Sequence, residues 1–266
     1  MENPKDYGFN SQLIHYSGHH DQYGAATVPI YQTSTFAFAS AQDGADCFAG
    51  VKPGYMYTRI GNPTVKALER QVALLEHACD SVALASGMAA VSCVYLALLN
   101  AGDHVVSSSA VYGASRVLME QHMSRFGVES TYVNTADIDA VKAAIKPNTK
   151  MIYIETPANP TMEISDIAAC AEIAHKAGAL LVVDNTFCSP YLSNPIDFGA
   201  DVVLHSITKF INGHADIVGG IVAAKEADVY AKLRGAMVNF GGNMDPHQAY
   251  LVIRGLKTLG IRVDRA

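Results

Sequence analysis

The stretch HSITKFINGHADIVGG, residues 205–220, holds a lysine in an unusual setting. Lys209 comes shortly after an apolar run, Asp201–Leu204, that predicts a buried strand. Its neighbours are the hydroxyl residues Ser206 and Thr208, and glycines follow, at which the backbone can turn tightly or approach another group. Two interpretations are open at this point. Lys209 is either a strand-end side chain that reaches out to water, or an amine with a lowered pKa that can form a Schiff base.

The composition narrows the class of protein. The 266 residues are 50% hydrophobic and 17% charged, which allows a large core in one α/β domain. With a net charge of −6 and no basic cluster, we expect no nucleic-acid partner. We expect no membrane partner either, because no apolar run is long enough to span a bilayer. The five cysteines form no CxxC pair and the N-terminus lacks a signal-peptide pattern, so we expect free thiols in a cytoplasmic protein.

Helix-like and strand-like segments alternate along most of the chain. The periodicity predicts helices over residues 64–77, 86–99, 112–126, 138–145, 164–177, 226–234 and 248–259. It predicts strands over residues 81–85, 104–107, 131–133, 150–155, 180–183, 201–205 and 221–224. Such alternation is typical of a mostly parallel sheet with helices on both faces. The short approach to the last strand favours an antiparallel orientation there.

Polar and aromatic residues stand at or just after the carboxyl ends of these strands. They are Ser86, Gly87, Met88, Tyr112, Asn159, Asp184, Ser206, Thr208 and Lys209. Because ligands of such sheets bind beyond the carboxyl ends of the strands, we expect these residues to converge on one crevice. The helix start at Ser86–Gly87 offers free N–H groups to an anion, although an ordinary helix cap has the same sequence.

Pyridoxal phosphate is a cofactor that accounts for the whole set. Its aldehyde needs a lysine, for which Lys209 is the candidate, and its pyridine nitrogen needs a buried carboxylate such as Asp184. Tyr112 would cover the ring, and Asn159 would bind the phenolic oxygen. The phosphate would be bound by Ser86, Gly87, Met88, Ser206 and Thr208. The sequence contains no strand followed by GxGxxG, no GxxxxGK[ST] and no cluster of metal ligands, so dinucleotide, nucleoside-triphosphate and metal chemistry are not indicated.

Seven pieces of the sequence carry a family resemblance. They are PIYQTSTF (29–36), YTRIGNPT (57–64), ASGMAA (85–90), ETPANPT (155–161), VVDNTF (182–187), HSITKFINGHAD (205–216) and RGLKTLGIRV (254–263). With these pieces the chain resembles the Cys/Met-metabolism family of fold-type I pyridoxal-phosphate enzymes. The resemblance implies an aspartate-aminotransferase-like fold. It is strongest to methionine γ-lyases, which implies α,γ-elimination of methionine to a thiol, 2-oxobutanoate and ammonia.

The resemblance also implies roles for particular residues. Tyr57 and Arg59 match a segment that binds the cofactor phosphate in the neighbouring subunit's site, which implies a homodimer that usually pairs into a tetramer. Tyr112 matches the ring-stacking tyrosine, which also helps to protonate the departing thiol. Lys209 would carry protons between the substrate and the cofactor. Residues 1–60 would form an extended segment on the neighbouring subunit, and residues 61–245 the cofactor-binding large domain.

Departures from the family pattern keep other substrates open. Ala114 stands where many methionine γ-lyases have a cysteine, and Met237–Phe240 replaces their usual Lys-Asp pair. Cystathionine γ-synthase, cystathionine lyase and O-acetylhomoserine sulfhydrylase are therefore alternatives. Residues 246–266 resemble the start of a helix that leads to a C-terminal small domain, which holds the arginine for the substrate carboxylate and has no counterpart here. For a naturally truncated chain we expect cofactor binding with poor or no turnover.

Overall fold

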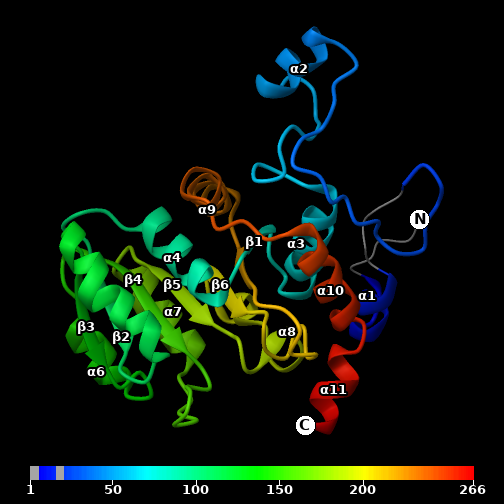
Figure 1. The fold of residues 1–266 in the computed structure, drawn as a ribbon. Helices are drawn as coiled ribbons and strands as arrows, with labels where there is room; N and C mark the ends of the chain where they lie inside the picture. Colours follow the sequence, from blue (N-terminus) through cyan, green and yellow to red (C-terminus); the bar gives the residue numbers. More distant parts are fainter. Residues whose placement is uncertain (1–5, 16–20) are drawn as a thin grey trace.

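The computed structural model describes residues 6–15 and 21–266, and seven strands of this part form one sheet (Figure 1). The strands are β1 (Asp80–Leu84), β2 (His104–Ser108), β3 (Glu129–Val133), β4 (Thr149–Glu155), β5 (Leu180–Asp184), β6 (Val202–Ser206) and β7 (Gly220–Ala224). Their order in the sheet is β1-β7-β6-β5-β4-β2-β3. β7 is antiparallel to β1 and β6, and the other neighbouring pairs are parallel. The predicted mostly parallel sheet with an antiparallel last strand is confirmed.

Helices cover both faces of this sheet, as predicted (Figure 1). One face is packed by α4 (Gly87–Leu98) and α9 (Ala227–Phe240), and the other by α3 (Pro63–Leu75), α6 (Ile138–Ala144), α7 (Ile167–Lys176) and α10 (Pro246–Leu256). Successive side chains of each strand point to opposite faces of the sheet. In β5, Val182 packs into the core on the α4 side, whereas Leu181 and Val183 pack into the core on the α7 side. Apolar residues at the first four positions of β5 are what a sheet buried on both faces requires.

Capping residues set where the helices begin. Asn62 caps α3, because its side-chain oxygen accepts the N–H of Thr64 and Pro63 occupies the first turn. α7 begins three residues later than the apolar pattern suggests. Asp166 accepts the N–H of Ala169 and so fixes the start of that helix at Ile167.

Two predicted helices are interrupted in the structure. Residues 113–126 form α5 (Gly113–Val117), a π-helical turn η2 (Leu118–His122) and a 3₁₀ turn η3 (Met123–Phe126), and no glycine or proline marks these changes. The predicted long helix over residues 248–259 is also wrong, because α10 ends at Leu256 and α11 (Leu259–Arg265) follows. The amide and hydroxyl of Thr258 both bind the carbonyl of Gly255, which ends the α10 ladder.

The N-terminal segment contains more helix than its sequence suggests. It forms two short helices, α1 (Phe9–His15) and α2 (Ala41–Phe48). α1 packs Leu13 into the core beside α3, and Ser40 caps α2. Residues 21–40 contain no helix, and Thr35 forms an isolated bridge with Tyr57. Figure 1 shows α2 on an arm that projects away from the sheet.

The remaining described elements are two short helices that join β5 to β6. They are α8 (Ser189–Leu192) and the 3₁₀ turn η4 (Pro195–Phe198). No helix in residues 6–15 and 21–266 is both long and apolar enough to cross a membrane. All five cysteines are free, as expected, and Cys79 is exposed.

Candidate active site

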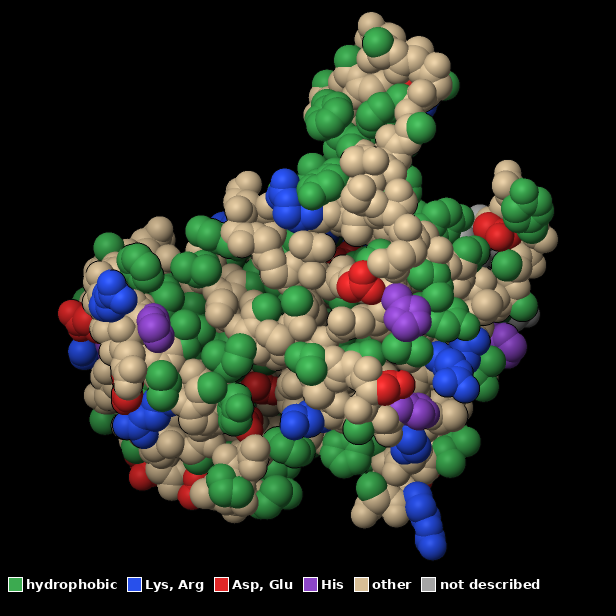
Figure 2. All heavy atoms as spheres, in the orientation of Figure 1, with side chains coloured by type: hydrophobic (Ala, Val, Ile, Leu, Met, Phe, Trp, Pro, Cys, Tyr) green, Lys and Arg blue, Asp and Glu red, His purple; other side chains and the backbone are tan. Residues whose placement is uncertain are grey.

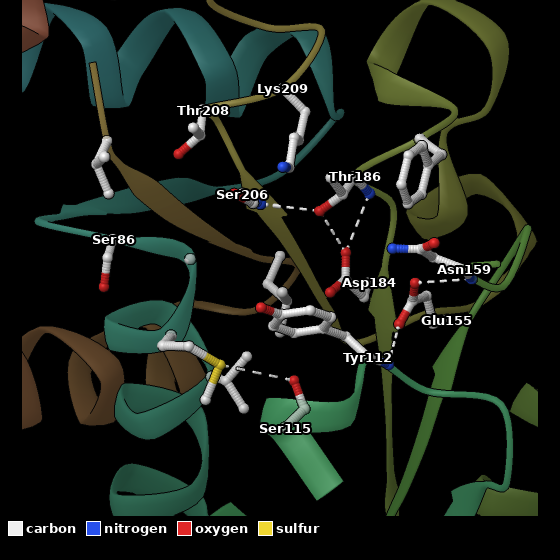
Figure 3. Close-up of a pocket in the computed structure, with 16 residues that line it drawn as sticks. Ser86, Tyr112, Ser115, Glu155, Asn159, Asp184, Thr186, Ser206, Thr208 and Lys209 are labelled. Carbon is white, nitrogen blue, oxygen red and sulfur yellow. Dashed lines mark hydrogen bonds between the residues drawn. The ribbon is translucent and has the colours of Figure 1, made fainter. Parts of the chain in front are cut away.

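The carboxyl ends of β4, β5 and β6 and the first turn of α4 surround a cavity of about 270 Å³ (Figure 3). The nine residues that the sequence places at strand ends all line it. They are Ser86, Gly87, Met88, Tyr112, Asn159, Asp184, Ser206, Thr208 and Lys209. The chain thus brings one amine, one aromatic ring, several hydroxyls and a helix N-terminus to a single cavity, although these groups are spread over more than a hundred residues of sequence.

The first turn of α4 supplies N–H groups to one wall of the cavity. The hydroxyl of Ser86 accepts the N–H of Ala89 at 3.0 Å, and the carbonyl of Ser86 accepts the N–H of Ala90 at 3.1 Å. The N–H groups of Gly87 and Met88 have no acceptor within the helix, because the first amides of a helix precede its carbonyl ladder. This end of the helix is therefore suited to an anion.

A glycine brings the α4 wall close to β6. A Cβ built on Gly87 would lie 2.8 Å from the Cβ of Ser206 and 2.9 Å from its hydroxyl oxygen. Any larger residue would push the helix N-terminus away from the strand end. Ser206 and the helix amides can therefore contact the same small ligand group only because residue 87 is glycine.

Asp184 is a buried carboxylate at the end of β5. Its Oδ1 atom accepts the N–H of Thr186 at 3.1 Å and the hydroxyl of Thr186 at 2.5 Å. That hydroxyl oxygen in turn accepts the N–H of Ser206 at 2.8 Å, so Thr186 joins β5 to β6 below the cavity. Burial raises the pKa of Asp184, and the hydrogen bonds from Thr186 oppose the rise. Asp184 Oδ2 has no hydrogen-bond partner in the described part of the chain, and a cationic N–H group in the cavity would satisfy it.

Lys209 and Tyr112 enter the cavity from opposite sides (Figure 3). Lys209 lies just after β6, and its Nζ atom has no hydrogen bond or ion pair among the described residues. Tyr112 precedes α5 and is 50% exposed, so only part of its ring is packed against the protein. The amine and the ring face the same space, as a carbonyl-bearing aromatic ligand would require.

Sequence reasoning missed a second carboxylate in this cavity. Glu155 ends β4 directly beside Asp184 in the sheet, and it is 3% exposed. Burial, together with the charge of Asp184, raises the pKa of Glu155 to about 7. Glu155 ends an apolar strand just as Asp184 does, so the signal that identified Asp184 could also have identified it. Thr186 and Ser115 also line the cavity and were not predicted.

Tyr57 and Arg59 lie outside this cavity. Both line a separate groove of about 350 Å³ that also includes Gln32 and Asp245. The guanidinium of Arg59 lies 5.4 Å from the centre of the Tyr57 ring and donates to the carbonyl of Val238. Within a single chain, these two side chains therefore do not contribute to the cavity that holds Lys209.

Comparison with known proteins places the chain in a family. The profile of the Cys/Met metabolism PLP-dependent enzymes matches residues 10–266. The chain belongs to this family. It is 46% identical to an L-methionine gamma-lyase of Treponema denticola over 97% of this chain and 65% of that protein. It is 46% identical to a cystathionine gamma-lyase of Bacillus subtilis over 91% of this chain and 61% of that protein.

A solved structure agrees with this assignment. The crystal structure of metB from Corynebacterium glutamicum superposes with a TM-score of 0.92 at 42% identity, over 98% of this chain and 66% of that one. The chain spans about two thirds of the length of the curated relatives that it matches. The expected resemblance to Cys/Met-metabolism enzymes of fold type I is confirmed.

The cavity of this Cys/Met-metabolism enzyme fits pyridoxal phosphate by the chemistry of its donors. Free amides at a helix N-terminus, beside a glycine without a Cβ, suit a phosphate. A buried carboxylate with one unpaired oxygen suits a protonated ring nitrogen, and an unpaired lysine suits an aldehyde. Burying these polar and charged groups without a ligand to pair them would cost free energy.

Proposed function

We propose that the chain is the cofactor-binding part of a carbon–sulfur lyase that eliminates the γ-substituent of methionine, releasing a thiol, 2-oxobutanoate and ammonia. The observation that carries this proposal is that Lys209 and Asp184 open onto one cavity whose opposite wall is a helix N-terminus. Family membership and 46% identity to a methionine γ-lyase support the reaction class. Pyridoxal phosphate, when bound, would supply an aldehyde and an electron-withdrawing ring.

Residues of the chain would hold the cofactor in three places. The amides of Gly87 and Met88 and the hydroxyls of Ser86, Ser206 and Thr208 would bind the phosphate. Asp184 would hold a proton at the ring nitrogen through its unpaired Oδ2. Asn159 would bind the phenolic oxygen, and Tyr112 would cover one face of the ring and exclude water from it.

Two side chains of the cavity would move protons. Lys209 Nζ, once released from the aldehyde carbon, can take a proton from the substrate Cα and return it at a neighbouring carbon. The hydroxyl of Tyr112 can donate a proton to the departing sulfur, because the ring lies across the cavity from Lys209. Lys209 and Tyr112 are therefore the proposed catalytic residues.

The proposed catalytic unit is a homodimer, paired into a tetramer. Tyr57 and Arg59 lie outside the chain's own cavity, which supports the expectation that they bind the phosphate in a partner's site. Figure 2 shows hydrophobic side chains on the projecting arm, where Phe48 is 69% and Val51 77% exposed. Exposed apolar groups of this size favour burial against another chain. In this proposal residues 1–60 contact the partner, residues 61–245 bind the cofactor, and residues 246–266, which fold as α10 and α11, connect to a C-terminal domain.

A cytoplasmic location is also part of the proposal. The five cysteines are free, and this state is usual in a reducing compartment.

Cystathionine cleavage or γ-replacement is the second candidate function. The identity to a cystathionine γ-lyase equals that to a methionine γ-lyase. Ala114 and Met237–Phe240 also depart from the usual methionine γ-lyase pattern. These alternatives differ in the substrate, not in the cofactor site.

The test has two stages. The chain mixed with pyridoxal phosphate should show the visible absorbance of a lysine-bound aldehyde, and Lys209→Ala should abolish that absorbance, with Lys225→Ala as a control for an unrelated lysine. Methionine, cystathionine, and O-acetylhomoserine with sulfide are then compared for release of keto acid and thiol. Absence of the absorbance in the unchanged chain would overturn the proposal. A preference for cystathionine would select the second candidate.

A further inference from the structure

Glu155 makes two contacts across the mouth of the cavity (Figure 3). Its Oε2 atom accepts the backbone N–H of Tyr112 at 2.6 Å, and its Oε1 atom accepts the backbone N–H of Asn159 at 3.2 Å. The two amides belong to different segments, one just before α5 and the other in the loop after β4. A single buried carboxylate therefore joins the two segments that carry the proposed ring-covering and oxygen-binding side chains.

Buried neighbours hold the backbone of each segment, since Val111 packs into the core and Ala158 is buried. Tyr112 is the residue before α5 and has no side-chain cap bond, and its own side chain is half exposed. Asn159 is exposed and lies between two prolines in the loop after β4. Neither side chain is packed in the core, and the bonds to Glu155 tie the two residues that carry them to one carboxylate.

The carboxylate is retained at this position at an energetic cost. Glu155 lies beside Asp184, its partner in the β4–β5 register, and burial together with that charge raises its pKa to about 7. A leucine would suit the buried strand end better if packing were the only requirement. The two N–H donors meet two separate oxygens here, and an ionised carboxylate is the side chain that offers two oxygens without a donor.

We propose that Glu155 is a positioning residue that fixes the distance between Tyr112 and Asn159 and so aligns the cofactor ring between them. The alignment of the ring rests on the proposed function, whereas the restraint on the two amides does not. Glu155 itself does not contact the reacting atoms. It acts through its hydrogen bonds to the backbone amides of Tyr112 and Asn159, whose side chains would contact the cofactor.

Amide hydrogen exchange of the 266-residue chain without cofactor tests the restraint directly. Glu155→Gln keeps the size of the side chain but leaves one acceptor oxygen for two amides. We expect exchange at Tyr112 or Asn159 to become about tenfold faster, which corresponds to the loss of one hydrogen bond to a charged acceptor. The matched control is Asp201→Asn, because Asp201 Oδ2 accepts the amide of Leu181 at the opposite end of β5. It should leave both cavity amides unchanged.

A second variant and a second readout separate positioning from general stability. Glu155→Asp keeps both oxygens and the charge but is one methylene too short to reach both amides, so it should also speed exchange at one of them at least. With cofactor added, both Glu155 variants should bind it about tenfold more weakly and change its visible circular dichroism, which reports ring orientation. The control should do neither.

The outcomes are decisive in each direction. Wild-type protection of both amides in Glu155→Gln and Glu155→Asp would overturn the proposal. Faster exchange at many amides throughout the sheet would also overturn it, because that pattern indicates a purely structural role. If the unchanged chain fails to bind the cofactor, the proposed function fails, while the exchange result still decides the role of Glu155.

Discussion

At the scale of single residues, the geometry of the site depends on Gly87. A Cβ at this position would meet Ser206 at 2.8 Å, and relief requires α4 or the end of β6 to move. We expect Gly87→Ala to weaken pyridoxal-phosphate binding about tenfold or more, since overpacking of this kind costs about 1–3 kcal/mol. Titration of the visible absorbance measures this.

The control for this substitution is Gly235→Ala. Gly235 lies inside α9, and nothing lies within 4 Å of a Cβ built there. Alanine is the better helix former, so stability should hold or rise and cofactor affinity should not change. Equal affinity of the two variants would show that the close approach of α4 to β6 does not matter for the phosphate.

The raised pKa of Glu155 predicts a dependence of stability on pH. A carboxyl with a pKa of about 7 in the folded chain and 4.5 when unfolded binds a proton more tightly in the folded state. Its contribution is therefore fully present below pH 4.5 and is lost as the pH rises to about 7. The loss is of the order of 3 kcal/mol.

Urea unfolding of the cofactor-free chain between these pH values measures the effect. Glu155→Gln cannot titrate, so its stability should fall less steeply over this window. The stability of the variant should still depend somewhat on pH, because burial also raises the pKa of Asp184, which lies beside Glu155 on β5. Lys209 lines the same cavity. Identical slopes for the variant and the unchanged chain would contradict the assignment of this titration to Glu155.

Single residues also show what the sequence could and could not predict. Asp184 was identified because a carboxylate after an apolar strand needs a purpose, and the fold brings it to Lys209. Glu155 is also a carboxylate at the end of an apolar strand, but the sequence distinguishes it only as the first residue of the family motif ETPANPT (155–161). Its function depends on two backbone amides, and no side-chain pattern in the sequence indicates which amides a carboxylate will meet.

At the scale of elements, Asn62 both starts α3 and anchors the N-terminal segment. Its oxygen caps the helix, and its side-chain nitrogen donates to the carbonyl of Tyr31 at 2.8 Å. We expect Asn62→Ser to keep the cap but lose the anchor, and Asn62→Ala to lose both. The alanine variant should cost about 1–3 kcal/mol in stability, and the serine variant less.

Denaturant unfolding and limited proteolysis distinguish the two roles of Asn62. Both variants should be cut faster near residue 31, whereas only the alanine variant should lose the full stability. Asp137→Ala serves as the control, because Asp137 is an exposed cap whose side chain accepts the N–H groups of Asp139 and Ala140 in its own helix, α6. A change in proteolysis near residue 31 in this control would argue against a specific anchor at Asn62.

Helix boundaries were predictable where a capping residue defines them and not where packing does. Asn62 and Pro63 mark the start of α3 in the sequence. The π-helical turn at Leu118–His122 has no marker, because the apolar spacing through it resembles an ordinary helix. The break after Leu256 follows from Thr258, whose amide and hydroxyl both bind the carbonyl of Gly255.

At the scale of the whole molecule, the mostly parallel sheet followed from general rules, whereas the arm did not. Alternating strands and helices predict a parallel sheet with its ligand site at the carboxyl ends. Val28 packs into the core, whereas α2 stands away from the sheet (Figure 1). In the proposed dimer a partner chain would cover the α2 arm, and a sequence read alone does not include that partner.

The proposed exchange of Arg59 between subunits can be tested by mixing two defective chains. Lys209→Ala removes the aldehyde-binding amine, and Arg59→Ala removes the guanidinium offered to the partner, so each variant alone should bind the cofactor poorly or not at all.

In a mixed dimer, one site has an intact Lys209 and receives an intact Arg59. Random exchange of equal amounts places half of the chains in mixed dimers, so about a quarter of all sites should regain tight binding. The visible absorbance of lysine-bound cofactor, measured after mixing and reassociation, gives this fraction. Absorbance equal to the mean of the two separate variants would mean that Arg59 serves the cavity of its own chain.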